Sequence, residues 1–366
     1  MDLGERFAFL AVSSIFFQYP KIGAALITHA GSARKVFEGD RNRFIHLFNN
    51  NRQLFDFYKL FNDWVKIEKN FEYMQKNGID IIVLGDSRYP KLLSEIVDPP
   101  PLFTIKGEGK KLLNAPCVGI VGARKARPSA LDKAAEIAEF LADKGYCVVS
   151  GLAYGIDTAA HKGAVSSSGE TIAVFGCGID TIYPSSNVWL SEKIVQKGLL
   201  LSEFPVGTIP MPRNFPQRNR IISGLSLGVI IVQAAVASGS LITARFALEQ
   251  GREVFSVPGE GGHPSCGGSN RLIRDGSMLI ESGEDVFEIL EKERLKYPFL
   301  EKSGHSYPDV DKGSPLLQFF PDKGSVSFDS LFSRSKMELP DFLRELTSLS
   351  LSGAIEELSG RRYRIT

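Results

Sequence analysis

Short apolar runs alternate with helical patterns of about 10–15 residues across positions 79–290, and this alternation constrains the fold most. Repeated strand–helix units place parallel strands in one sheet with helices on both faces. Such sheets bind ligands at the carboxyl ends of their strands, where the strand order changes direction. The sequence therefore predicts an α/β core whose strand-exit loops carry the function. We expect strands over 81–84, 117–121, 146–150, 171–175, 199–203, 229–233 and 253–257, and helices over 129–144, 156–167, 187–197 and 240–250.

The flanks differ in composition from this core. Eleven of the 25 Phe residues fall within 1–75, which predicts a small helical domain with an aromatic core. Residues 297–314 lose periodicity and gain Pro, Gly and Ser, as a linker does. A compact helical unit over 315–366 ends in GRRYRIT, a short β-hairpin pattern. The predicted domains are therefore 1–75, 79–296 and 315–366, with 297–314 as the linker.

The chain is not a polycation that binds through a basic tail, because its 43 Lys and Arg residues are balanced by 42 Asp and Glu residues. Four Cys form no CxxC pair, so no zinc site, other metal site or disulfide framework is expected. The N-terminal apolar stretch follows Asp2 and Glu5 and lacks the basic lead of a signal peptide. No apolar run reaches the ~18 residues of a membrane span. We expect a cytoplasmic protein without membrane contact.

Two glycine-rich strand exits could bind an anion. The loop 119–129 carries Arg124, Lys125 and Arg127 without an acid and leads into a helix N-terminus. A tight turn capped by Ser129 is the alternative interpretation. The loop 176–187 ends at Asn187, a candidate N-cap. Neither loop is a GxGxxG or P-loop motif.

The strand exit at 150–157 brings an acid close to a histidine. Asp157 could pair with His161 one helical turn later. We interpret this pair as structural, because no Ser or Cys nucleophile is tied to the histidine by a known pattern.

The longest acid-free stretch covers the 45 residues between Glu203 and Glu249. It includes four arginines, with Phe215-Pro-Gln-Arg-Asn-Arg220 before one strand and Ala237-Ser-Gly-Ser-Leu-Ile-Thr243 after it. Arginine binds phosphate bidentately, and asparagine contacts phosphates or base edges. Arginines that only hold loop carbonyls remain the alternative. The chain is almost neutral as a whole, but positive charge is concentrated in this stretch.

Seven motifs in order resemble the DNA-processing protein A family, DprA or Smf, over about 80–290. They are GIVGAR, VVSGLAYGID, TIAVFGCGID, SEFP, FPQRNRIISGLS, SGSLITA and GSN. The resemblance implies an extended Rossmann-like core that binds single-stranded DNA without known catalysis or cofactor. It also implies a homodimer that protects incoming DNA in natural transformation and helps load the RecA recombinase. The flanks resemble the family's SAM or helix-hairpin-helix-like domain and its winged-helix-like domain. Equal numbers of acids and bases in the latter favour a protein-interaction or regulatory role.

The resemblance also implies a set of DNA-binding residues and no catalytic residue. Arg124 matches a phosphate-contacting arginine, 218–220 matches an RNR element, and 239–243 matches an SGSxxTA turn. Ser185, Ser186 and Val188 depart from the pattern, since many members have a basic residue and an aromatic one there, and Gln233 replaces a usual Glu. Tyr183 or Phe215 could supply a stacking platform instead. The predicted set is Gly122, Ala123, Arg124, Ser129, Gly151, Ser185, Arg218, Asn219, Arg220, Gly239, Ser240 and Thr243.

Two enzyme classes are alternatives to this binding module. Base-releasing nucleotide hydrolases of a related fold carry a PGGxGTxxE signature, but Phe246 stands where their Glu is expected. Without that carboxylate the general acid/base is missing. A dinucleotide-dependent oxidoreductase is disfavoured because GxGxxG is absent.

Overall fold

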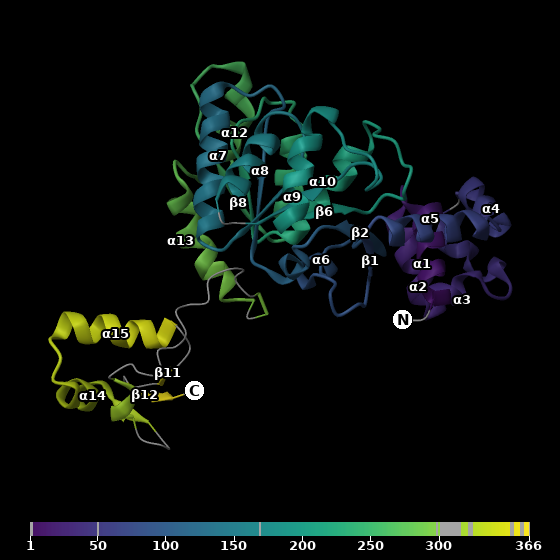
Figure 1. Cartoon of the computed structure of the whole chain (residues 1–366). Helices are drawn as coiled ribbons and strands as arrows, with labels where there is room; N and C mark the ends of the chain where they lie inside the picture. The colour runs from purple at the N-terminus through teal and green to yellow at the C-terminus, as the bar shows by residue number, and fades with distance from the viewer. Residues whose placement is uncertain are drawn as a thin grey trace. The chain divides into compact units, whose positions relative to one another are not determined.

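The computed structural model describes residues 3–49, 51–167, 170–297, 299–300, 316–320, 325–351, 355–358 and 362–365. The chain divides into two compact units, Met1–Ser303 and Gly304–Thr366 (Figure 1). The first holds the N-terminal helices and the large sheet, and the second holds a small three-stranded sheet. The linker predicted at 297–314 lies mostly outside the described residues.

The N-terminal segment is helical, and its aromatic side chains form its core. Asn51 and Asp63 start α4 and α5 by accepting hydrogen bonds from backbone N–H groups. Phe16, Phe48 and Tyr58 pack together in a buried cluster. The elements are α1 (Leu3–Phe16), α2 (Pro20–Ala30), α3 (Ala33–Phe37), η1 (Arg41–Phe48), α4 (Arg52–Leu60) and α5 (Trp64–Lys76).

A nine-stranded sheet forms the centre of the first unit, in the order β1-β2-β6-β5-β4-β3-β7-β8-β9. Strands β3 to β9 pair in parallel with one another, because buried apolar runs are joined by crossover helices. The strands are β1 (Ile79–Val83), β2 (Leu102–Lys106), β3 (Cys117–Val121), β4 (Cys147–Ser150), β5 (Thr171–Val174), β6 (Leu199–Ser202), β7 (Gly228–Ile231), β8 (Glu253–Ser256) and β9 (Met278–Leu279). The predicted α/β class is confirmed.

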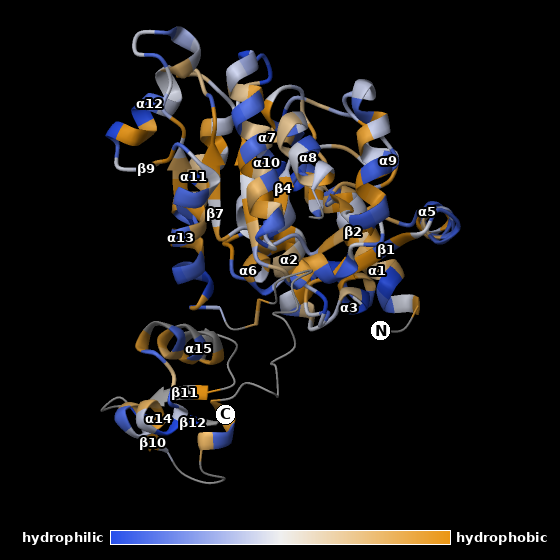
Figure 2. Cartoon of the chain, turned by 60° about the vertical axis from the view of Figure 1, so that its left-hand side comes forward, coloured by the Kyte–Doolittle hydropathy of each residue, from blue (hydrophilic) through white to orange (hydrophobic). Residues whose placement is uncertain are grey.

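Helices cover both faces of this sheet. On one face, Ile137 of α7 and Ala160 of α8 pack with Ile120, and on the other Ile222 of α10 packs with Val149. Figure 2 shows hydrophobic colour on strands such as β2 and β7 and hydrophilic colour on α13. The helices are α6 (Lys91–Ser94), η2 (Lys110–Asn114), α7 (Pro128–Asp143), α8 (Ile156–Ser166), η3 (Ser185–Asn187), α9 (Val188–Lys197), α10 (Asn214–Leu225), α11 (Ser240–Glu249), η4 (Pro264–Cys266), α12 (Gly267–Arg274) and α13 (Gly283–Arg294).

Three local expectations need correction. Strand β1 is not parallel: β1 pairs antiparallel with β2, and β2 with β6. The stretch around Arg218 is no loop but helix α10, since Pro216 lies in its first turn, where the missing N–H costs nothing. Ser129 does not cap α7, because Arg127 is the N-cap residue and Pro128 the first helical one.

The strand order changes direction between β3 and β7, next to each other in the sheet. From β3 the chain adds β4, β5 and β6 on one side and then crosses back to β7 on the other. The carboxyl ends of β3, β4 and β7 therefore meet where an open α/β sheet forms its ligand crevice.

The second unit has the order of elements expected of a winged-helix-like domain. Two helices precede a β-hairpin, in which Ile355 pairs with Ile365, and β10 completes the sheet β10-β12-β11. Leu331 and Phe342 lie in its buried core. Its elements are η5 (Leu317–Phe319), β10 (Val326–Ser327), α14 (Phe328–Ser335), α15 (Leu339–Leu351), β11 (Ile355–Leu358) and β12 (Arg362–Ile365).

Candidate nucleic-acid interface

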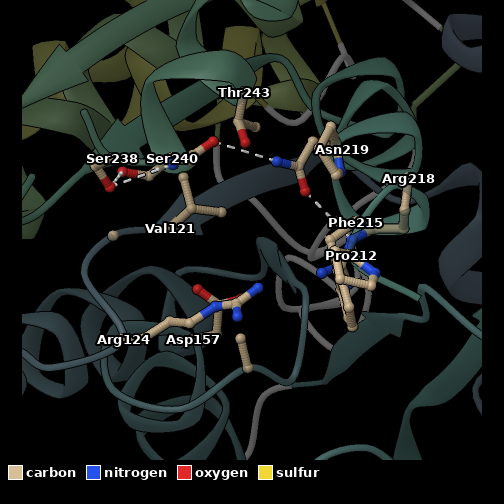
Figure 3. Close-up of a pocket in the computed structure, with 14 residues that line it drawn as sticks. Val121, Arg124, Asp157, Pro212, Phe215, Arg218, Asn219, Ser238, Ser240 and Thr243 are labelled. Carbon is tan, nitrogen blue, oxygen red and sulfur yellow. Dashed lines mark hydrogen bonds between the residues drawn. The ribbon is translucent and has the colours of Figure 1, made fainter. Parts of the chain in front are cut away.

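A cavity of about 360 Å³ lies at the switch point, where β3, β4 and β7 end and where α8, α10 and α11 begin (Figure 3). Because the N-terminal end of a helix is the positive end of its dipole, this end of the sheet favours anions. The cavity is lined by Val121, Gly122, Arg124, Ala153, Asp157, Pro212, Phe215, Pro216, Arg218, Asn219, Ser238, Gly239, Ser240 and Thr243.

Arg124 is the exposed cation of this cavity. Its loop is fixed by the backbone, because Ala123 N donates to Gln233 O at 2.7 Å and Ile156 N donates to Ala123 O at 3.2 Å. Its guanidinium carbon lies 5.2 Å from the centroid of the Phe215 ring. Within the described residues Arg124 has no carboxylate at ion-pair distance, so its charge is open to a bound anion.

Arg218 forms a buried wall of the cavity. Only 3 % of the residue is exposed, and its guanidinium donates to Gly151 O at 2.9 Å and to Val174 O. Burial lowers the pKa of Arg218 to about 10, which still leaves the side chain charged at neutral pH. Arg218 therefore ties the ends of β4 and β5 to α10 and adds a fixed positive charge.

Asp157 and His161 do not form the predicted pair. Gly151 N donates to Asp157 Oδ2 at 3.1 Å, and burial raises the pKa of that carboxyl. His161 Nδ1 lies 2.8 Å from Thr171 Oγ1, whose hydroxyl donates to Val148 O. Since that hydroxyl proton is used, Nδ1 of the histidine is the donor. Each side chain holds a strand end in place through its own partner, so the structural Asp–His pair is not formed.

Phe215 and Tyr183 form an aromatic pair at the cavity. Their ring centroids are 5.6 Å apart with an interplanar angle of 42°. Tyr183 is 41 % exposed, and Phe215 is half-buried in the cavity lining. A base can stack on such rings whatever its identity. The two platforms considered separately from the sequence thus adjoin each other.

Hydroxyl and amide groups surround the start of α11. Ser238 Oγ lies 2.7 Å from Ser240 Oγ, and Asn219 Nδ2 donates to Gly239 O at 3.4 Å. Thr243 is 1 % exposed, and its hydroxyl has no hydrogen-bond partner among the described residues. Because a buried hydroxyl without a partner is unfavourable, this one is suited to bind a ligand in the cavity.

Arg220 lies elsewhere, on the opposite side of α10. It is 1 % exposed, and its guanidinium contacts Glu203 at 2.6 Å and Asp98 at 3.1 Å. Neighbouring Gln217 donates to Phe17 O at 2.5 Å, which joins α10 to the N-terminal helices. The expectation that Arg220 reaches the cavity is therefore not met, because Glu203 and Asp98 bind it instead.

The structure brings together part of the predicted set. Gly122, Arg124, Arg218, Asn219, Gly239, Ser240 and Thr243 line the cavity, whereas Ala123, Ser129, Gly151, Ser185 and Arg220 do not. Gly151 lies directly behind the wall, against Arg218. Asn187 occupies the N-cap position of α9, but its side chain donates to Leu152 O and Thr158 Oγ1 rather than capping.

The predicted set lacks several other lining residues: Val121, Ala153, Asp157, Pro212, Pro216 and Ser238. Pro212 and Pro216 lie just before and within α10, a helix that was not predicted, whereas Asp157 and Ser238 lie in strand-exit segments that were.

The described residues contain no group of three or more His, Cys, Asp or Glu arranged to hold a metal ion. All four cysteines are buried as free thiols. No helix in the described part of the chain is both long enough and apolar enough to cross a membrane.

Comparison with known proteins links this chain to one family. The model of the family described as DNA recombination-mediator protein A matches residues 80–291. The chain is 35 % identical to Protein Smf of Escherichia coli over 303 residues, which cover 82 % of this chain and 81 % of the relative. It is 42 % identical to DNA processing protein DprA of Bacillus subtilis over 234 residues, 63 % of this chain and 78 % of the relative.

Solved structures agree with this relationship. DNA processing protein A of Streptococcus pneumoniae superimposes with a TM-score of 0.68 at 34 % identity, over 78 % of this chain and 98 % of that one. DNA processing protein A of Helicobacter pylori, studied for its single-stranded DNA binding mode, gives 0.53 at 31 % identity, over 59 % and 96 %. The chain therefore belongs to the DNA recombination-mediator protein A family of DNA processing proteins.

Proposed function

We propose that this protein binds single-stranded DNA, independently of sequence, in the cavity at the switch point of its sheet. One observation carries the proposal: the unpaired charge of Arg124, the ring of Phe215 and the start of α11 surround the same space, and Tyr183 extends the aromatic surface beside Phe215. The relative from Helicobacter pylori, whose single-stranded DNA binding mode is known, supports the ligand class.

The cavity separates phosphate contacts from base contacts. Arg124 binds phosphates, with the Thr243 hydroxyl as a further donor. Phe215 and Tyr183 accept stacked bases. Phosphate contacts position the strand and every base has a flat face, so this arrangement does not select a sequence. A duplex keeps its bases stacked inside and cannot use the aromatic pair.

Family membership supports the biological setting that we propose. As a DNA processing protein, the chain acts in the cytoplasm on DNA taken up in natural transformation, protects it as a homodimer and helps load the RecA recombinase. It has no catalytic role in this account. Asp157 is the only acid of the cavity lining, and we assign it a structural role because it is buried and holds Gly151 N in place.

Fluorescence anisotropy of a labelled oligo(dT), with a matched duplex as control, tests the proposal. We expect the single strand to bind more tightly, and Phe215→Leu to weaken it by about 1–3 kcal/mol through lost stacking. Phe246→Leu is the matched control, since Phe246 also lies beside an arginine, Arg245 at 5.8 Å, but outside the cavity lining. Equal affinity for both DNA forms contradicts the proposal. Release of free base from nucleoside monophosphates would instead support the hydrolase.

A further inference from the structure

An exposed tryptophan lies between two lysines on the surface formed by α8 and α9. Trp189, in the first turn of α9, is 42 % exposed. The Lys193 ammonium, one turn along α9, lies 5.4 Å from the centroid of its ring, and the Lys162 ammonium of α8 lies at 5.3 Å. The indole is therefore flanked by cations from two helices. We call Lys162, Trp189 and Lys193 the tryptophan patch.

The charges of the tryptophan patch are not neutralised. Lys162 and Lys193 are exposed, and neither makes an ion pair with a carboxylate in the described part of the chain. Other surface lysines do, such as Lys133 with Glu136 at 2.8 Å. Unpaired cations beside a flat ring are the combination that binds single strands: the cations follow the phosphates and the ring stacks a base.

The tryptophan patch is joined to the cavity through η3. Asn187 Nδ2, at the start of α9, donates to Thr158 Oγ1 of α8 at 2.8 Å and to Leu152 O at 2.9 Å, beside the cavity wall. Trp189 follows Tyr183 by six residues, so at most about 20 Å separates their backbones. Figures 1 and 2 both show α8 and α9 side by side. Tyr183 and Trp189 therefore lie on one short segment that runs beside the cavity wall.

We infer that the tryptophan patch is a second contact site for single-stranded DNA, which holds the nucleotides that follow those in the cavity. The inference rests on the proposed function. A base stacks on Trp189 in place of one ammonium, because stacking is stronger than an exposed cation–π contact, and the released lysine binds the adjacent phosphate. Ser185 and Ser186, which lie between Tyr183 and Trp189 in the chain, are uncharged, so Lys162 and Lys193 supply the positive charge for these nucleotides.

Oligonucleotide length separates this site from the cavity. A short oligo(dT) of about 4 nucleotides occupies the cavity, and one of about 16 nucleotides also reaches the tryptophan patch. We expect Trp189→Ala to lower the affinity for the long oligonucleotide by roughly five- to a hundredfold and to leave the affinity for the short one unchanged. The double variant Lys162→Ala, Lys193→Ala lowers the salt slope for the long oligonucleotide by about 1.4, or 0.7 for each lost contact.

Intrinsic fluorescence reports on stacking directly. Trp64 and Trp189 are the two tryptophans of the chain, so Trp64→Phe leaves Trp189 as the single reporter. The long oligonucleotide should quench its emission, and the short one should not. Lys144→Ala is the matched control for the lysines. The Lys144 ammonium lies 5.3 Å from the Phe140 ring centroid, but Lys144 precedes the amino-terminal end of β4, whereas the cavity lies at the carboxyl ends of the strands.

Failure of this inference is distinguishable from failure of the proposed function. In one outcome, Arg124→Ala lowers the affinity for both oligonucleotides, Trp189→Ala lowers neither affinity, and the fluorescence of Trp189 is not quenched. The tryptophan patch is then no DNA site, and the cavity remains one. If the wild type binds neither oligonucleotide, both proposals are overturned. Equal weakening of both lengths by Trp189→Ala also overturns the inference, because it indicates a general structural role.

Discussion

The guanidinium group of Arg218 fills the space that a side chain at position 151 would need. A Cβ atom on Gly151 would lie 2.5 Å from both terminal nitrogens of Arg218, and Gly151 O accepts a hydrogen bond from the same group. The glycine at the end of β4 thus serves the packing of an arginine from α10, a relationship that joins two motifs 67 residues apart.

Gly151→Ala should therefore destabilise the protein. The added methyl group displaces Arg218 from its carbonyl partners, which costs about 1–3 kcal/mol of unfolding free energy and weakens single-strand binding. Urea unfolding measures the loss. Gly261→Ala is the control, because a Cβ there has no neighbour within 4 Å and its backbone is not left-handed. Equal stability of the two variants would disprove the packing argument.

His161 should make the protein sensitive to acid. Burial lowers the pKa of His161 to about 3, against about 6.5 in an unfolded chain. Between these values the unfolded state binds a proton that the folded state does not, so stability falls as the pH falls, by about 1.4 kcal/mol per pH unit. His161→Gln removes this dependence. Unfolding free energies of the two proteins at pH 6.5, 5.5 and 4.5 test it; parallel curves are the contrary result.

Thr243→Val should separate stability from binding. The Thr243 hydroxyl is buried at the cavity without a partner among the described residues. Its replacement by a methyl group removes an unsatisfied polar atom, so stability should stay the same or rise by up to about 1 kcal/mol. Single-strand affinity should fall, because the ligand loses a donor. Thermal unfolding and anisotropy on the same samples decide this, and loss of stability without loss of affinity would refute it.

The Arg220–Glu203 ion pair should matter to the fold of α10. Its members are 1 % and 4 % exposed, so Glu203→Ala leaves a buried charge with a single remaining carboxylate, Asp98. We expect a loss of about 3–5 kcal/mol. Arg220→Met combined with Glu203→Leu should lose much less than the sum of the single changes, since no unpaired charge remains. Additive losses in urea unfolding would show that the pair is not coupled.

The sequence predicts the core of the sheet well because its strands are continuous apolar runs. Cys117–Val121 is buried on both faces and matches the expected strand at both ends. Helix α10 was not predicted, since FPQRNR lacks an apolar period and contains Pro216. Arg218 and Arg220 stand two residues apart on α10, yet one faces the cavity and the other an ion pair. That difference depends on tertiary contacts with Gly151 and Glu203, which no local pattern encodes.

Salt dependence of single-strand binding tests the central claim most directly. Anisotropy titrations of oligo(dT) over a salt series compare the wild type with Arg124→Ala and with Arg127→Ala. Arg127 lies three residues away but outside the cavity lining, paired with Glu260 at 2.6 Å. We predict that Arg124→Ala weakens binding and lowers the slope of log K against log salt by about 0.7, while Arg127→Ala leaves both close to wild type. An Arg124→Ala protein with wild-type affinity and slope would contradict the account.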